Sequence, residues 1–131
     1  MPIKPLDIYD VASLFSEEER LIHATVKGWV TERFLPLVEE HYEAGTFPLE
    51  LVPELAQLGV FGATLPEEYG CAGVSHSAYG LINQALEYGD SGLRSFVSVQ
   101  SGLVMYPIFS FGTEEQKQRW LPRLARGEAI G

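Results

Sequence analysis

A single arginine, Arg94, stands among small and apolar residues in segment 90–108, which reads DSGLRSFVSVQSGLVMYPI. On a helix with about 100° between neighbouring residues, one side carries Ser91, Arg94, Ser98, Ser101 and Met105, and the opposite side carries Phe96, Val99, Leu103 and Tyr106. The first side is a shallow stripe of small side chains with one cation. An unpaired guanidinium is too costly to bury, so Arg94 must meet an anion.

Two kinds of anion could meet Arg94. Glu87 lies near the end of the preceding expected helix and could fold back across the DSG turn to form an ion pair. Alternatively, an anion from solution could bind, with Ser95 and Ser98 adding hydroxyl donors beside the arginine. The two are compatible, because a guanidinium held by one carboxylate still presents other N–H groups. The small residues of the stripe leave room for a thin chain.

The other reactive side chains form no common catalytic or metal-binding motif. His23, His41 and His76 are scattered singly, so we interpret them as ordinary core or surface residues. Cys71 is the one cysteine and is interpreted as a buried or incidental thiol. The paired carboxylates at 67 and 68 could do acid–base chemistry, but in an acidic chain they suit a solvated loop. We expect no metal site.

Two capping boxes mark where helices begin. The pairs are Ser16 with Glu19 and Thr113 with Gln116. At this spacing the side chain of each residue can accept a hydrogen bond from the backbone N–H of the other. Glycines suited to end helices stand at positions 45, 59 and 127. Helices are therefore expected to start near residues 16 and 113.

Apolar residues at helical spacing fill most of the chain. The expected helices cover residues 16–44, 49–58, 75–88, 91–111 and 113–126, with bends or interruptions at Pro36 and Pro107. The glycine-rich segment 59–74 lacks this period and is expected to be a loop packed through Phe61, Leu65 and Tyr69. No strand pattern is convincing. The sequence predicts an all-α, bundle-like domain of about five to six helices.

Size and composition narrow the class of protein. The chain of 131 residues fits one domain that needs no disulfide. Its net charge of -9, with only 9 lysines and arginines, argues against a nucleic-acid partner. The start MPIKPLDIYD lacks the pattern of a signal peptide, and no stretch is long enough to span a bilayer. We expect a cytoplasmic protein in a reducing compartment.

Nearly all of the chain from about Phe15 resembles the amino-terminal α-helical domain of the acyl-CoA dehydrogenases. The stretches LGVFGATLPEEYGCAGVS and FGTEEQKQRWLPRLARGE are similar to the wider family. The stretch SGLRSFVSVQSGLVMYPI resembles a smaller group within the family, the glutaryl-CoA dehydrogenases. The resemblance implies that residues 1–131 form one such helical domain.

The resemblance also implies a reaction and a role for each candidate residue. Enzymes of this family use FAD to remove hydrogens from the α and β carbons of an acyl-CoA thioester, and the glutaryl enzymes then lose carbon dioxide to give crotonyl-CoA. Arg94 would hold the distal carboxylate of the substrate, Ser95 and Ser98 would assist, and Glu87 would belong to the same polar cluster. Electrons would pass to an electron-transfer flavoprotein, and the complete protein would be a homotetramer.

Family members also have a middle β domain with most flavin contacts and a carboxy-terminal helical domain with the catalytic base. Because neither is expected in residues 1–131, we nominate no catalytic residue and no flavin ligand, and we expect this chain alone to be inactive. Two alternatives stay open. The chain could serve another acyl-CoA, or glutaryl-CoA without decarboxylation, or it could be a helical interaction module without flavin.

Overall fold

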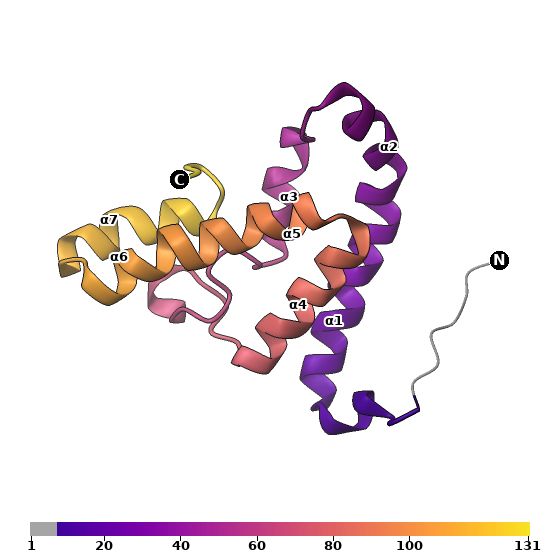
Figure 1. The fold of residues 1–131 in the computed structure, drawn as a ribbon. Coiled ribbons are helices and arrows are strands. Elements are labelled where there is room, and N and C mark those ends of the chain that lie inside the picture. The colour runs from indigo at the N-terminus through magenta and orange to yellow at the C-terminus, as the bar shows by residue number, and fades with distance from the viewer. Residues whose placement is uncertain (1–7) are drawn as a thin grey trace.

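The computed structural model describes residues 8–131, and these form helices joined by turns and one long loop, with no strand among them (Figure 1). The α-helices are α1 (Glu17–Trp29), α2 (Leu35–Ala44), α3 (Val52–Gln57), α4 (His76–Gly89), α5 (Ser91–Ser98), α6 (Tyr106–Phe111) and α7 (Glu114–Ala125). Shorter 3-10 turns cover Val11–Leu14, Leu49–Leu51 and Glu67–Tyr69. The predicted all-α class is confirmed.

Two long helices pass through π-helical segments. The segment Val30–Phe34 joins α1 to α2, and the segment Val99–Met105 joins α5 to α6. Each is followed by a proline, Pro36 or Pro107, in the first turn of the next α-helix. Proline has no N–H to donate, and the wider π turn lets the helix continue past it. The expected interruptions are thus local changes of winding, and the described chain has five continuous helices.

The predicted helix starts are confirmed by side-chain caps. Ser16 and Glu19 form a complete capping box, as do Thr113 and Gln116. Gly45 adopts the left-handed conformation at the end of α2, with φ of 65°. These caps satisfy backbone groups that helix ends would otherwise leave unpaired.

Helix α4 is the centre of the arrangement. It packs along α1 on one side and meets α5 at an angle on the other, while α6 lies beside α7 (Figure 1). Its inner face is buried through Ala78, Ile82, Ala85 and Leu86. The two helices that carry Glu87 and Arg94 are therefore held by the core on both sides of their junction.

The loop at 59–74 fills the space beneath this angle. Phe61, Leu65 and Tyr69 are buried, as predicted. Ser101 fixes the loop to the Val99–Met105 segment, because its hydroxyl accepts from Gly62 N at 2.9 Å and donates to the Val60 carbonyl at 3.3 Å. These contacts attach the loop to the helix that follows Ser98.

A buried glutamine fastens the last residues of the chain. Gln100 Nε2 donates to the carbonyl oxygens of Leu124 at 3.2 Å and Ala129 at 2.9 Å, and its Oε1 accepts from Gly131 N at 3.1 Å. All the polar groups of the Gln100 side chain are thus engaged, which explains how this residue can be buried.

Candidate functional site

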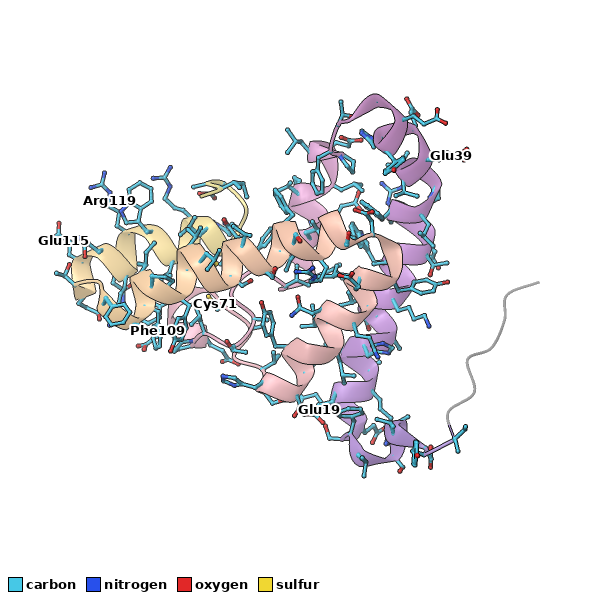
Figure 2. The ribbon with its side chains drawn as sticks, viewed as in Figure 1. Glu19, Glu39, Cys71, Phe109, Glu115 and Arg119 are labelled. Atoms are coloured by element: carbon cyan, nitrogen blue, oxygen red, sulfur yellow. The ribbon has the colours of Figure 1, made fainter. Side chains whose placement is uncertain are left out.

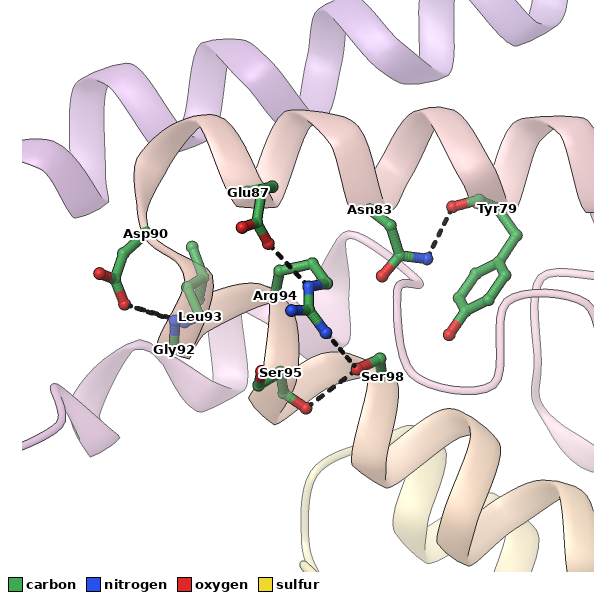
Figure 3. Close-up of polar contacts among 9 residues, drawn as sticks. All are labelled: Tyr79, Asn83, Glu87, Asp90, Gly92, Leu93, Arg94, Ser95 and Ser98. Atoms are coloured by element: carbon green, nitrogen blue, oxygen red, sulfur yellow. Dashed lines mark hydrogen bonds and ion pairs between the residues drawn. The ribbon is translucent and has the colours of Figure 1, made fainter.

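The junction between α4 and α5 brings Glu87 and Arg94 together. Asp90 breaks the helix with an extended backbone and caps α5, since its Oδ2 accepts from Gly92 N at 2.7 Å and Leu93 N at 3.2 Å. Across this turn Arg94 Nε donates to Glu87 Oε2 at 2.7 Å (Figure 3). The ion pair considered from the sequence is confirmed.

Ser98 meets the same guanidinium from the next turn of α5. Arg94 Nη1 donates to Ser98 Oγ at 3.3 Å, and that hydroxyl donates onward to the Ser95 carbonyl at 3.2 Å (Figure 3). The arginine is thus held on two edges by Glu87 and Ser98. Its Nη2 makes no hydrogen bond with residues 8–131 and is available to another acceptor.

Ser95 takes part through its backbone carbonyl. Ser95 also lines a different groove, of about 410 Å³, together with Phe47, Phe96 and Ile130 among others. Arg94, Ser98 and Glu87 therefore form one cluster, with Ser95 behind it.

The Arg94 side chain is partly open to solvent. It is 36% exposed and that of Glu87 is 50% exposed. A fully exposed ion pair contributes little to stability. A ligand that covers this partly buried pair would exclude water and so strengthen its hydrogen bonds. The guanidinium is therefore partly buried and still accessible to a ligand from solvent.

A groove opens between α4 and the α5–α6 helix beyond the ion pair. Tyr79, Asn83 and Glu87 are spaced by four on α4, so they share one face, and Arg94, Ser98 and Gly102 do the same on the facing helix until its winding changes. The Glu87–Arg94 contact shows that the two faces look toward each other.

This groove has a volume of about 180 Å³. Its lining comprises Gly62, Thr64, Leu65, His76, Tyr79, Ser101, Gly102 and Tyr106. A Cβ atom on Gly102 would meet none of the described atoms within 4 Å, so there is open space beside this glycine. The cavity is smaller than a typical ligand pocket and suits a narrow chain.

The helical wheel of the Arg94 segment is corrected by the structure beyond residue 98. Ser101 and Met105 are buried against the loop, whereas Arg94, predicted on the same side, is partly exposed, and Val99, Leu103 and Tyr106 on the opposite side are exposed. The physical reason is the π-helical segment Val99–Met105, whose i to i+5 bonding changes the angle per residue. The small-residue stripe is therefore continuous only from Ser91 to Ser98.

The other reactive side chains are placed as ordinary residues. Burial raises the pKa of the Cys71 thiol to about 11, which disfavours the reactive thiolate. Figure 2 places Cys71 inside the fold, whereas Glu115 and Arg119 project outward from α7. Burial, with the nearby Lys27 charge, lowers the pKa of His23.

Metal binding and membrane spanning find no support in the described residues. Within residues 8–131 no group of three or more His, Cys, Asp or Glu side chains is arranged to hold a metal ion. No helix in this part of the chain has both the length and the apolar character needed to cross a membrane.

Tyr79, which lines this cavity, and Asn83, one helical turn away, were not predicted as site residues from the sequence. Asn83 Nδ2 donates to the Tyr79 carbonyl at 2.9 Å, and both side chains project from α4 (Figure 3). Tyr79, Asn83 and Glu87 follow one another at intervals of four residues, and this spacing is the signal that could have found the first two.

Comparisons with known proteins agree with the fold. The model of the acyl-CoA dehydrogenase N-terminal domain matches residues 16–128. The crystal structure of a glutaryl-CoA dehydrogenase from Mycobacterium smegmatis in complex with FADH2 superposes with a TM-score of 0.93 at 51% identity, over 97% of this chain and 33% of that one.

Two curated relatives are more distant. The (2S)-methylsuccinyl-CoA dehydrogenase of Cereibacter sphaeroides is 35% identical over 91% of this chain and 22% of its own length. The 3-(aryl)acrylate reductase of Clostridium sporogenes is 32% identical over 87% of this chain and 30% of its own length.

The chain belongs to the acyl-CoA dehydrogenase family and matches its N-terminal helical domain. The resemblance noted in the sequence is thereby confirmed. The chain spans about a third or less of the length of these relatives.

Proposed function

We propose that this chain is the helical domain of an FAD-dependent glutaryl-CoA dehydrogenase and that it forms the distal wall of the acyl pocket. The observation that carries the proposal is the partly buried guanidinium of Arg94, held by Glu87 and Ser98 with Nη2 free, on the pair of helices that line a small cavity farther along. A carboxylate at the far end of an acyl chain matches this arrangement in charge and geometry.

The cluster orients the arginine before the substrate arrives. Glu87 takes the Nε edge and Ser98 takes Nη1, so the guanidinium cannot swing freely and its Nη2 edge is left for the ligand. Charge-assisted hydrogen bonds of this kind are about twice as strong as neutral ones. An acyl chain that ends in a methyl group would displace water from Arg94 and offer the Nη2 donors no acceptor. The cost of these unpaired donors would make the site select substrates that end in an acid group.

The reaction follows from the family. A glutaryl thioester would lose hydrogens at its α and β carbons, and then carbon dioxide, to give crotonyl-CoA. FAD, when bound, would accept the hydride. The catalytic base and most flavin contacts would come from the middle β and carboxy-terminal domains, so residues 1–131 alone would be inactive.

The described residues fit one wall of a flavin site rather than a set of flavin ligands. Val99, Leu103 and Tyr106 are exposed and apolar along the helix beyond Arg94, and such a face suits cover by a ring system or by another domain. The electron-transfer flavoprotein, the homotetramer and the cytoplasmic location come from the resemblance or from composition and stay predictions.

A dehydrogenase for another dicarboxylic acyl-CoA is the second candidate. The name of the Cereibacter sphaeroides relative supports it, because a methylsuccinyl group also carries an acid at the end remote from the thioester. The same Arg94 cluster would serve both substrates, with the length of the groove deciding between them.

The test is turnover by the complete protein with FAD. We expect glutaryl-CoA to be oxidised with a dye as electron acceptor and crotonyl-CoA to be the product. Arg94→Ala should lower kcat/KM for glutaryl-CoA about 100-fold and leave pentanoyl-CoA, which has a methyl group in place of the acid, nearly unchanged. Undiminished glutaryl-CoA activity in Arg94→Ala would contradict the proposal, and a colourless complete protein would favour the interaction module.

A further inference from the structure

Asn83 has a buried oxygen that its surroundings do not satisfy. Its Oδ1 accepts no hydrogen bond from the part of the chain that the structure describes. The amide cannot simply be turned over, because Nδ2 already donates to the Tyr79 carbonyl at 2.9 Å. Leaving a buried amide oxygen without a hydrogen-bond donor is destabilising, so the presence of Asn83 at this position requires an explanation.

The position of Asn83 connects it with the Arg94 cluster. Asn83 lies one helical turn from Glu87 on the same face of α4, a rise of about 6 Å, and Glu87 contacts Arg94 across the turn between α4 and α5. In the other direction, Tyr79 lines the cavity. Figure 3 shows the Asn83 side chain projecting from α4 into the angle that holds Arg94 and Ser98. The unsatisfied oxygen therefore lies on the side of α4 that faces the Arg94 cluster.

The chemistry of this oxygen restricts what can meet it. An amide oxygen only accepts hydrogen bonds, and so does the carboxylate of a dicarboxylic substrate, so direct contact between the two would be repulsive. One water molecule resolves the conflict, because it can donate one hydrogen to each. Water bridges of this kind are nearly as favourable as direct hydrogen bonds.

We propose that Asn83 is a specificity-determining residue whose Oδ1 anchors a water molecule that donates its second hydrogen to the acid group bound by Arg94. This inference rests on the proposed function. Arg94 then supplies charge, and the Asn83 water supplies a second contact that a terminal methyl group cannot accept. Discrimination between acid and methyl ends therefore comes from both helices of the groove.

The experiment compares two substrates in the complete protein with FAD. Asn83→Leu removes the acceptor at similar side-chain size. We expect its KM for glutaryl-CoA to rise about tenfold with kcat little changed, whereas its KM for pentanoyl-CoA stays the same or falls. Gln84→Leu is the matched control, since Gln84 is the exposed neighbour on α4 and lines a pocket with His23 and Lys27 instead. It should alter neither KM.

A second variant covers the case in which Asn83→Leu does not fold. Asn83→Asp keeps the shape and adds a negative charge beside the carboxylate, so its KM for glutaryl-CoA should rise more than tenfold, while pentanoyl-CoA is little affected. A merely structural role would change both substrates by the same factor, and that result, or no change, would overturn the inference. If Arg94→Ala abolishes the preference for glutaryl-CoA but both Asn83 variants keep it, only this inference fails. If wild-type protein has no such preference, both proposals fail.

Discussion

Arg94 Nε and Glu87 Oε2 lie 2.7 Å apart across the turn that joins α5 to α4. This ion pair does two things at once. It connects the ends of two helices whose other faces are buried in the core, and it fixes which edge of the guanidinium remains open. The distance from Glu87 to Arg94 along the chain is short, so the geometry depends chiefly on how Asp90 shapes the turn.

Replacing Asp90 tests that dependence. Asp90→Ala removes the side chain that accepts from Gly92 N and Leu93 N, so we expect the free energy of unfolding to fall by about 0.5–2 kcal/mol. Urea unfolding measures the change. Glu39→Ala, at an exposed position of α2 (Figure 2), should stay within about 0.5 kcal/mol of wild type. Equal stability of the two variants would show that the cap does not hold the turn.

Gln100 offers a test of the buried polar network. Gln100→Leu would leave the carbonyls of Leu124 and Ala129 and the N–H of Gly131 without their partner. We expect a loss of about 1–3 kcal/mol in unfolding free energy, measured by urea denaturation. Gln57→Leu, at an exposed position of α3, is the control. An unchanged Gln100→Leu variant would mean that these three contacts contribute nothing.

Two glycines should respond to alanine with opposite signs. Gly62 has φ of 62°, and a Cβ there would collide with Met105, so Gly62→Ala should destabilise the chain by about 1–3 kcal/mol. Gly28 is in α1 with nothing within 4 Å of its would-be Cβ, so Gly28→Ala should stabilise by about 0.5–1 kcal/mol. Thermal unfolding gives both values. A stabilising Gly62→Ala would show that the loop can move away from Met105.

Glu54 should make the free energy of unfolding depend on pH. Hydrogen bonds from Arg33, and secondarily from Trp29, lower the pKa of Glu54 to about 2 from an ordinary 4.5. Because the folded pKa is the lower one, the stabilisation is present above pH 4.5 and is lost as the pH falls toward 2. The difference in unfolding free energy between wild type and Glu54→Gln should therefore shrink over this interval. A difference that is constant from pH 7 to about 2 would contradict the assignment.

The local parts of the fold could be predicted from sequence because their signals are local. Ser16, Thr113 and Gly45 act within one turn of the chain, and their caps were predicted correctly. The Glu87–Arg94 pair was also accessible, because both residues flank one short turn. The packing of Phe61 in the loop followed from its apolar type.

The remainder depends on winding and on contacts distant in sequence. No residue type marks a π-helical segment, so a wheel drawn from Arg94 at a constant angle could not predict that Ser101 and Met105 are buried while Arg94 is partly exposed. Asn83 could not be predicted as a site residue, because only the structure shows that its side-chain oxygen is buried without a hydrogen-bond donor. The place of Ser95 in the lining of a separate groove likewise requires coordinates.

The central claim is that Arg94 binds the acid end of the substrate. A crystal structure of the complete protein with glutaryl-CoA measures this directly. We expect the terminal carboxylate oxygens about 2.7–2.9 Å from the Nη atoms of Arg94, with Glu87 still on Nε. A terminal carboxylate in open solvent, or more than about 4 Å from the guanidinium, would contradict the account.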